Sequence, residues 1–273
     1  MLLGIDIGGT TISLGLVDKD QIVKKVCVPS FPREATLEKT LKYLSGHIQS
    51  ILTKDTTHIG IGVPTLVDVE RGIVYNALNI ASWKEVHLKE YLETRFGLPV
   101  AVNNDANCYA MGATARMSFR KGTLVCVTLG TGTGIGIVTD NRLFAGDHCG
   151  AGEICSLPYE GSIMEAYCSK QFFENQGLDA RRCSEAAAAG DAEALAQFHA
   201  FGHHLGVLLS VVMFAYDPSA IVLGGGVANS FPLFQDSMVK TLREHYLYGH
   251  VLDTLDIQAM PDADTALLGA SLL

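Results

Sequence analysis

One pattern of short apolar runs and turns occurs twice along this 273-residue chain. In the first copy, a glycine turn at Gly8 and an aspartate turn at Asp18 separate three apolar runs. In the second copy, Gly130 and Asp140 stand at the same spacing among three similar runs. Short apolar runs bounded by turn residues predict antiparallel strands. Because the pattern repeats at a fixed offset, it indicates a duplicated domain core.

Helical spacing and further apolar runs fill the rest of each half. Residues 36–52 carry apolar side chains three and four positions apart, which predicts an amphipathic helix, and the run at 59–63 predicts a buried strand that Pro64 ends. Helices are also expected over 84–96, 106–117, 162–174, 184–189, 191–214, 229–247 and 265–273, and strands over 72–77, 99–103 and 220–223.

Strands and helices mixed in two similar halves predict an α/β protein with two lobes and a substrate cleft between them. The expected N-terminal lobe spans residues 1–116, and the last helix, 265–273, packs back onto it. The expected C-terminal lobe spans residues 117–264.

The charge balance argues against two classes of partner. The net charge is −9, and Lys and Arg form no run. A nucleic-acid or anionic-membrane surface needs clustered basic residues, so neither is expected as a partner. The N-terminal residues carry no targeting pattern, no apolar stretch approaches the roughly 20 residues of a membrane helix, and the seven cysteines form no C-x-x-C pair. These features favour an enzyme of the reducing cytoplasm.

Three glycine-rich segments are candidates for contacts with phosphate groups. A turn without Cβ atoms lets backbone N–H groups approach an anion, and threonine hydroxyls add donors. The first segment, Gly8–Thr11, follows Asp6, whose carboxylate would hold Mg²⁺ through water; a plain hairpin with a solvated aspartate is the alternative. The second, Gly130–Gly136, contains four glycines, more than a simple hairpin requires. The third, Gly224–Gly226, suits either the close approach of adenine or a tight turn. None of them is a Walker A or dinucleotide motif.

Asp105 lies where an expected strand gives way to an expected helix. It is either the N-cap of that helix or a general base that accepts a hydroxyl proton during phosphoryl transfer. Glycine-rich segments on both sides of it in the sequence favour the base. Asn103, Asn104 and Asn107 crowd the same corner, and their amide donors and acceptors suit a polyhydroxy substrate.

Two glutamates are further candidates for the site. Glu153 and Glu165 would accept hydrogen bonds from sugar hydroxyls, although such residues are ordinarily solvated surface charges. No zinc site is expected, because no close-pair spacing of zinc ligands occurs among His148, Cys149, Cys155 and Cys168.

These motifs together resemble sugar kinases of the ROK family (repressors, open reading frames and kinases), within the actin/hexokinase-like ATPase superfamily. The matching segments cover nearly the whole chain and are Gly4–Thr11, Gly60–Pro64, Asn79–Trp83, Asn104–Asn107, Leu129–Gly136, Gly152-Glu153, Glu165 and Leu223–Val227. The resemblance implies the two-lobed actin/hexokinase-like (ribonuclease H-like) fold and the use of ATP with Mg²⁺.

The resemblance also implies a role for each matching residue. Asp105 would be the catalytic base. The sugar would bind to Asn79, Asn104, Glu153 and Glu165. The ATP phosphates would bind to Gly8, Gly9, Thr10, Thr11, Thr131, Gly132, Thr133 and Gly134, and adenosine would lie against Gly225 and Gly226.

Several positions depart from the family pattern. Thr11 stands where the family usually has lysine, Ser156 replaces its signature histidine, and Ala113 stands where many members have glutamate. Residues 155–164 form a shorter segment in place of the C-x-C-G-x-x-G-C zinc loop. The lost histidine removes a sugar contact as well as a zinc ligand. Because Asp105 and both glutamates remain, activity is still expected.

The sequence therefore predicts an ATP- and Mg²⁺-dependent kinase of a hexose or N-acetylhexosamine, most similar to glucokinases and acting on a primary hydroxyl. The resemblance implies a homodimer or larger assembly. One alternative is a catalytically weak sugar-sensing regulator, and another is a superfamily kinase with a non-sugar acceptor.

Overall fold

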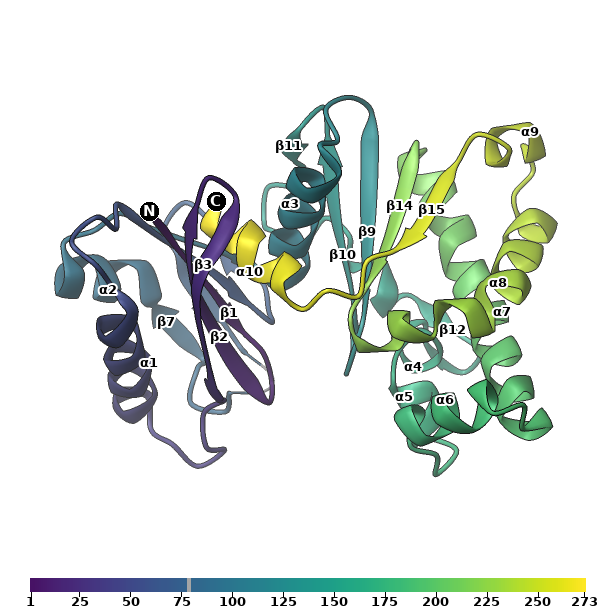
Figure 1. Cartoon of the computed structure of the whole chain (residues 1–273), viewed down its shortest axis with the longest axis horizontal. Helices are drawn as coiled ribbons and strands as arrows, with labels where there is room; N and C mark the ends of the chain where they lie inside the picture. Colours follow the sequence, from purple (N-terminus) through teal and green to yellow (C-terminus); the bar gives the residue numbers. More distant parts are fainter. Residues whose placement is uncertain (78–79) are drawn as a thin grey trace. The chain divides into compact units, whose positions relative to one another are not determined.

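The chain folds into two compact units in a computed structural model that describes residues 1–77 and 80–273 (Figure 1). The first unit comprises Met1–Arg120, Asn141–Ala151 and Ala263–Leu273. The second comprises Lys121–Asp140 and Gly152–Asp262. Residues 117–120, 141–151 and 263–264, expected in the C-terminal lobe, are grouped with the first unit.

The first unit is built on a five-stranded sheet in the order β3-β2-β1-β4-β8. The first three strands form an antiparallel meander, and β4 and β8 continue the sheet parallel to β1. The strands are β1 (Leu2–Ile7), β2 (Thr11–Asp18), β3 (Gln21–Pro29), β4 (His58–Val63) and β8 (Val100–Asn104). A separate three-stranded sheet contains β5 (Val67–Asp68), β6 (Ile73–Tyr75) and β7 (Glu85–His87).

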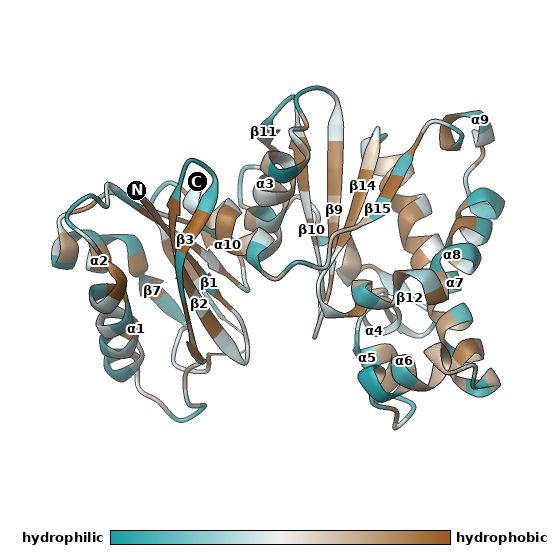
Figure 2. Cartoon of the chain, viewed as in Figure 1, coloured by the Kyte–Doolittle hydropathy of each residue, from teal (hydrophilic) through white to brown (hydrophobic). Residues whose placement is uncertain are grey.

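Alternation along β1 directs side chains to two packed faces of this sheet. Leu3 and Ile5 belong to a core with Leu44 and Ile48 of α1 (Leu37–Ile51). Helix α2 (Leu88–Phe96) contributes to the same core through Leu88 and Leu92, and it ends at Gly97 in the left-handed conformation. Figure 2 shows β1 and β2 largely in apolar colours, as expected for strands that are covered by other elements.

The C-terminal helix α10 (Asp264–Ser271) packs on β1, β4 and α3 (Asp105–Met117). A Cβ at Gly60 of β4 would collide with the carbonyl oxygen of Ala270 in α10. Lys25 of β3 forms an ion pair with Asp264 at the start of the helix. Glycine in β4 therefore allows the backbone of α10 to approach the sheet closely.

The second unit repeats the sheet topology of the first. Its five strands follow the order β11-β10-β9-β14-β15, with β9 and β10 antiparallel and β14 parallel to both β9 and β15. The strands are β9 (Thr123–Leu129), β10 (Thr133–Thr139), β11 (Arg142–Leu143), β14 (Ala220–Gly224) and β15 (Asp256–Ala259). The predicted duplication of an α/β core is therefore confirmed: each sheet has a three-stranded meander followed by two parallel strands.

Helices of the second unit surround the long helix α7 (Ala192–Tyr216), which packs mainly on α8 (Phe231–His245). The remaining elements are the 3₁₀ helices η1 (Glu153–Ser156) and η2 (Gly226–Ser230), the hairpin β12 (Pro158–Tyr159) and β13 (Ser162–Ile163), and the helices α4 (Glu165–Cys168), α5 (Gln171–Glu174), α6 (Ala180–Ala188) and α9 (Gly249–Leu252).

Helix α7 is an exception to the expectation that no segment approaches membrane-spanning length. By length and composition it could cross a membrane, but 56% of its apolar window is buried inside the protein. Core helices of this kind pass the same test, so the helix is weak evidence for a membrane span.

Residues 162–174, expected as one helix, instead form β13 and the two short helices α4 and α5. Ser169 has an extended conformation between the two helices, and the backbone N–H of Lys170 donates to the Gly130 carbonyl, 2.9 Å away. This long-range bond replaces the intrahelical pattern that local spacing favours.

Candidate active site

Asp105 is the first residue of α3, and Asn104 is the N-cap of that helix. Asn104 Oδ1 accepts hydrogen bonds from the backbone N–H groups of Ala106 and Asn107, at 2.9 and 3.3 Å. The alternative in which Asp105 is the N-cap is therefore wrong. Asp105 Oδ1 does accept from the Ala106 N–H at 2.8 Å, and its side chain stays partly exposed at the helix N-terminus. A carboxylate at this end of a helix is stabilised by the helix dipole.

A buried polar network fixes the corner that carries Asp105. Asn103 Oδ1 accepts hydrogen bonds from Asn107 Nδ2 at 2.9 Å, from the Asn104 backbone N–H at 2.8 Å and from Cys149 Sγ at 3.3 Å. Asn103, Asn107 and Cys149 are all buried. Because buried polar groups with several partners hold one arrangement, this network orients the strand-to-helix turn. Asn103 and Asn107 are thus structural members of the corner.

Asp6 on β1 and Asp105 directly after β8 lie on either side of β4, the strand between them in the first sheet. Asp6 of β1 pairs in register with Gly62 of β4, and a Cβ at Gly62 would stand 3.5 Å from the Cα of Asp105. Both carboxylates act on the buried thiol of Cys108: burial first, then the charges of Asp6 and Asp105, raise its pKa well above the ordinary value. The sheet therefore brings together two carboxylates that the sequence separates widely.

The environment of Asp6 suits a cation. Burial raises the pKa of Asp6 to about 6, although the nearby charge of Lys25 acts in the opposite direction. A carboxylate removed from water in this way gains energy when a positive charge approaches it. Mg²⁺ commonly binds through one or two carboxylates together with substrate phosphates and water. Asp6, with Asp105 near it, fits this manner of binding, whereas the described residues contain no cluster of three or more metal-ligating side chains.

The first glycine-rich segment is the turn of the β1–β2 hairpin. The Gly8 N–H donates to the Thr11 carbonyl at 2.9 Å, and Ser30 holds the turn through its hydroxyl to the Gly8 carbonyl and its N–H to the Thr10 carbonyl. Gly9, Thr10 and Thr11 are exposed, and Thr11 begins β2. The turn is thus anchored from behind, and its tip faces solvent.

The second glycine-rich segment is the corresponding turn of the β9–β10 hairpin. Residues 130–132 form the turn, whereas Gly134 and Gly136 lie within β10. The carboxylate of Glu165 lies against this turn: its Oε1 accepts from the Thr133 N–H at 2.9 Å, and a Cβ at Gly132 would collide with that oxygen. Thr133 Oγ1 donates to the Cys168 carbonyl at 2.8 Å. The α4 segment therefore braces the turn.

Glu153 and Glu165 belong to one electrostatic group in the second unit. Glu153 begins η1 and is exposed, yet desolvation and then the charge of Glu165 raise its pKa. Burial and the same two carboxylates raise the pKa of Cys155 to about 12. The two predicted sugar-binding glutamates are therefore neighbours, although they come from separate elements.

Gly225 lies beside the second turn. Its φ of 80° is in the left-handed region, and a Cβ there would collide with the carbonyl oxygen of Leu129, the last residue before the turn. Gly225 precedes η2, so Gly225 and Gly226 form the strand-to-helix connection that was one of the two interpretations. The close approach of the Gly225 backbone to the turn at 130–132 is compatible with the other interpretation, in which adenine lies against these glycines.

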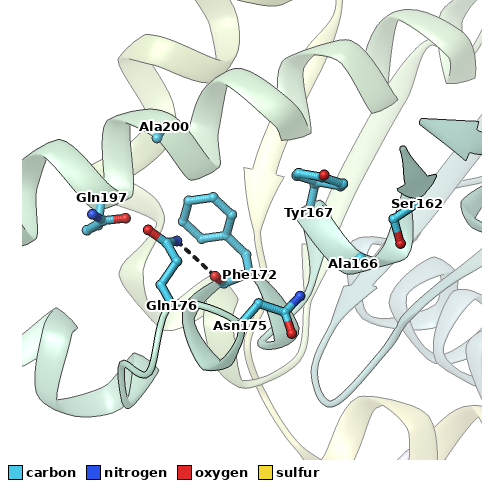
Figure 3. A pocket seen from close by; sticks show the side chains of 8 residues that line it. All are labelled: Ser162, Ala166, Tyr167, Phe172, Asn175, Gln176, Gln197 and Ala200. Carbon is cyan, nitrogen blue, oxygen red and sulfur yellow. Dashed lines mark hydrogen bonds between the residues drawn. The ribbon is translucent and has the colours of Figure 1, made fainter. Parts of the chain in front are cut away.

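Asn79 lies outside the residues that the structure describes. A pocket of about 380 Å³ is lined by Tyr167, Phe172, Asn175, Gln176 and Gln197 among others, and none of the predicted site residues lines it (Figure 3).

Comparison with known proteins places this architecture in a family. The model of the ROK family matches residues 2–273. The chain belongs to the ROK family. It is 29% identical to a glucokinase of Streptomyces coelicolor, over 99% of this chain and 96% of the relative. It is 28% identical to an N-acetyl-D-glucosamine kinase of Aliivibrio salmonicida, over 90% of this chain and 91% of the relative.

A solved structure of the ROK family shares the whole fold. The ROK family glucokinase of Streptomyces griseus, crystallised with glucose and AMPPNP, has a TM-score of 0.84 and 29% identity, and the match covers 99% of this chain and 97% of that one. The predicted actin/hexokinase-like α/β fold and the ROK resemblance are thereby confirmed.

Some residues that contact the predicted ones in this ROK protein carry no sequence signal of their own. Lys25 is close enough to act on Asp6, and Ser30 anchors the first turn, but both lie on or just after β3, far along the chain. Tyr216 at the end of α7 bonds to the backbone of Gly152, next to Glu153. No local motif marks such residues, because only sheet order and helix packing bring each of them beside a predicted residue of its own unit.

Proposed function

We propose that the chain is an ATP-dependent kinase that phosphorylates a hexose or N-acetylhexosamine at a primary hydroxyl. The observation that carries the proposal is the position of Asp105, partly exposed at the N-terminus of α3 and beside Asp6, in a chain that matches the ROK family from end to end. The relatives named glucokinase and N-acetyl-D-glucosamine kinase support the choice of acceptor.

Asp105 is the proposed general base. Its carboxylate accepts or orients the proton of the attacking hydroxyl as the γ-phosphoryl group is transferred. The polar network of Asn103, Asn107 and Cys149 holds the helix start that carries it, so the carboxylate is positioned before substrate binds.

The ATP phosphates are proposed to bind at the exposed tip Gly8–Thr11 of the first hairpin and at Thr131–Gly134 of the second, with adenosine near Gly225 and Gly226. Asp6 would hold Mg²⁺, through water, and the cation would offset the charge that develops on the transferred phosphoryl group. Glycine at these turns leaves backbone N–H groups accessible to anions.

The sugar is proposed to bind Glu153, Glu165 and Asn104. Asn104 has already committed its carbonyl oxygen to the helix N-terminus, and its Nδ2 donates to the Thr65 carbonyl at 3.3 Å. Among the described residues no second acceptor bonds to this Nδ2, so its other hydrogen is proposed to donate to a sugar oxygen. The carboxylates of Glu153 and Glu165 supply acceptors for hydroxyl groups.

A panel of sugars tests the proposal. Release of ADP from Mg-ATP would be measured by coupled assay with glucose, mannose, fructose, N-acetylglucosamine, N-acetylmannosamine and no sugar. ADP release that depends on one of the sugars supports the kinase and identifies its acceptor. No ADP release with any sugar, while one of them raises the melting temperature, would refute the kinase and support a sugar sensor.

We also propose that the protein acts in the cytoplasm, binds neither nucleic acid nor membrane, and assembles as a homodimer. The net charge of −9 supports the exclusion of nucleic-acid and membrane partners. Light scattering after size-exclusion chromatography would give the assembly state, and a monomer mass of 29.2 kDa would contradict the dimer.

A further inference from the structure

Three aromatic side chains from separate elements of the second unit gather in one group. Tyr159 of β12, Tyr167 of α4 and His204 of α7 form this group, termed here the aromatic cluster. The hydroxyl of Tyr159 and Nδ1 of His204 are hydrogen-bonded at 3.0 Å. The rings of Tyr159 and Tyr167 meet edge to face with centroids 5.3 Å apart, and those of Tyr167 and His204 lie 4.9 Å apart. Contacts of this geometry stabilise beyond the burial of their area.

The aromatic cluster ties a small hairpin to a rigid helix. His204 is part of the 25-residue helix α7, whereas β12, β13 and α4 contain two, two and four residues. Tyr167 also donates its hydroxyl to the Glu160 carbonyl in the hairpin turn at 2.7 Å. Desolvation raises the pKa of Tyr159 to about 12 and lowers the pKa of His204, so their bond joins two neutral groups at pH 7.

Strands β12 and β13 and helix α4 are too short to be stable without tertiary contacts. A single helical turn is unstable in isolation, so the position of α4 depends on its tertiary contacts. Tyr167 of α4 and Phe172 of α5 face α7, where they line the same pocket as Ala200 (Figure 3), and the tilted rings of Phe172 and His204 have centroids 5.7 Å apart. Contacts with α7 therefore contribute to the position of α4 and of α5 in the second unit.

The first residue of α4 is Glu165, which contacts the glycine-rich turn. Its Oε1 accepts from the Thr133 N–H, while the Cys168 carbonyl accepts from the Thr133 hydroxyl and the Lys170 N–H donates to the Gly130 carbonyl. A shift of α4 would move all three bonds together. The position of the turn therefore depends on the position of α4.

We propose that the aromatic cluster is a positioning element: it holds Glu165 against the turn at 130–132 and so sets how that turn presents its backbone to the nucleotide. The nucleotide part rests on the proposed function, in which this turn binds ATP phosphates. Tyr159, Tyr167 and His204 act through Glu165 and Thr133, and they need not touch substrate.

Amide hydrogen exchange at Thr133 tests the structural step without any need for activity. Tyr159→Phe removes only the hydroxyl and keeps the ring, while His204→Leu removes the imidazole. Both changes are expected to accelerate exchange of the Thr133 N–H by about fivefold or more, as Glu165→Ala should. The Gly134 N–H, bonded to Thr128 Oγ1 at 3.2 Å, serves as an internal control. Unchanged Thr133 exchange in Tyr159→Phe and His204→Leu would overturn the proposal.

His204→Gln offers a rescue, because its amide can keep a hydrogen bond to Tyr159. This variant is expected to retain more Thr133 protection than His204→Leu. Equal loss of protection in the two would show that the bond to Tyr159 does not position Glu165.

Kinetics then test the link to the nucleotide. Tyr159→Phe is expected to raise the KM for ATP about three- to tenfold, and the KM for the sugar should rise as well because Glu165 is also a proposed sugar ligand. Tyr248→Phe, at an exposed tyrosine of the same unit, should change neither. Faster Thr133 exchange with an unchanged KM for ATP would overturn the nucleotide step. If the wild-type chain forms no ADP with any sugar, the proposed function fails, and the exchange result alone decides whether the aromatic cluster positions Glu165.

Discussion

Replacing Asp6 by asparagine is expected to raise the free energy of unfolding at neutral pH. Burial raises the pKa of Asp6 from its ordinary value of 3.8 to about 6. Since the unfolded chain keeps the ordinary value, the ionised carboxylate destabilises the folded state by about 3 kcal/mol. Asparagine has nearly the same shape and no charge, but its amide also needs hydrogen-bond partners. We therefore expect a gain of about 1 to 3 kcal/mol at pH 7.5.

The pH dependence of this gain has a defined sign. Below pH 3.8 the carboxyl group is protonated in both states and carries no penalty. Between pH 3.8 and about 6 the unfolded chain ionises first, so the wild-type chain loses stability as the pH rises, and the full penalty remains above that range. The stability of Asp6→Asn lacks this contribution, so its advantage should disappear on acidification.

Urea unfolding at pH 7.5 and pH 4 measures both effects. The chain has one tryptophan, Trp83, which is buried in the core of the same unit as Asp6 and reports on the unfolding of that unit. Asp20→Asn is a matched control, since Asp20 is exposed with φ 62°, which asparagine adopts readily. A lower stability of Asp6→Asn at pH 7.5, or the same difference at both pH values, would refute the reasoning. The variant should also lose about 100-fold or more in ADP formation, because its amide is a poor ligand for Mg²⁺.

Two glycine substitutions test the close backbone approaches. Gly60→Ala should lower the free energy of unfolding by about 2 to 3 kcal/mol, because its Cβ would collide with the Ala270 carbonyl. Gly46→Ala, within α1 and with nothing within 4 Å of the added Cβ, should instead raise it by about 0.5 to 1 kcal/mol; similar effects of the two would contradict the packing of α10. Gly225→Ala, with its left-handed φ and its contact with Leu129, should raise the KM for ATP about tenfold in steady-state kinetics, and an unchanged KM would remove this turn from the nucleotide site.

The repeated pattern of short apolar runs and turns was enough to predict the two sheets, because the strands that follow this pattern depend on local sequence. The glycine turns at Gly8 and Gly130 do lie at equivalent hairpins of the two units. The strand at Asp256–Ala259 was missed, since its four residues alternate little and it forms by pairing in parallel with β14. Parallel pairing over a long connection leaves no local signal.

The details of the candidate site were harder to predict. Asn104 and Asp105 are adjacent and both are favoured N-cap residues, so only the extended backbone of Asn104 shows which of them caps the helix. The contact between Glu165 and Thr133 joins residues 32 positions apart. Such contacts depend on tertiary packing, which helical spacing within 162–174 does not encode.

The most direct test of the central claim compares turnover of the wild-type chain with that of Asp105→Asn. Initial rates of ADP release would be measured with saturating Mg-ATP and the sugar identified from the panel, and the sugar affinity by calorimetry, with Asp20→Asn as the control. If Asp105 is the general base, turnover should fall by about 10²- to 10⁴-fold while sugar affinity changes little. Turnover of Asp105→Asn equal to that of the wild-type chain would contradict the assignment.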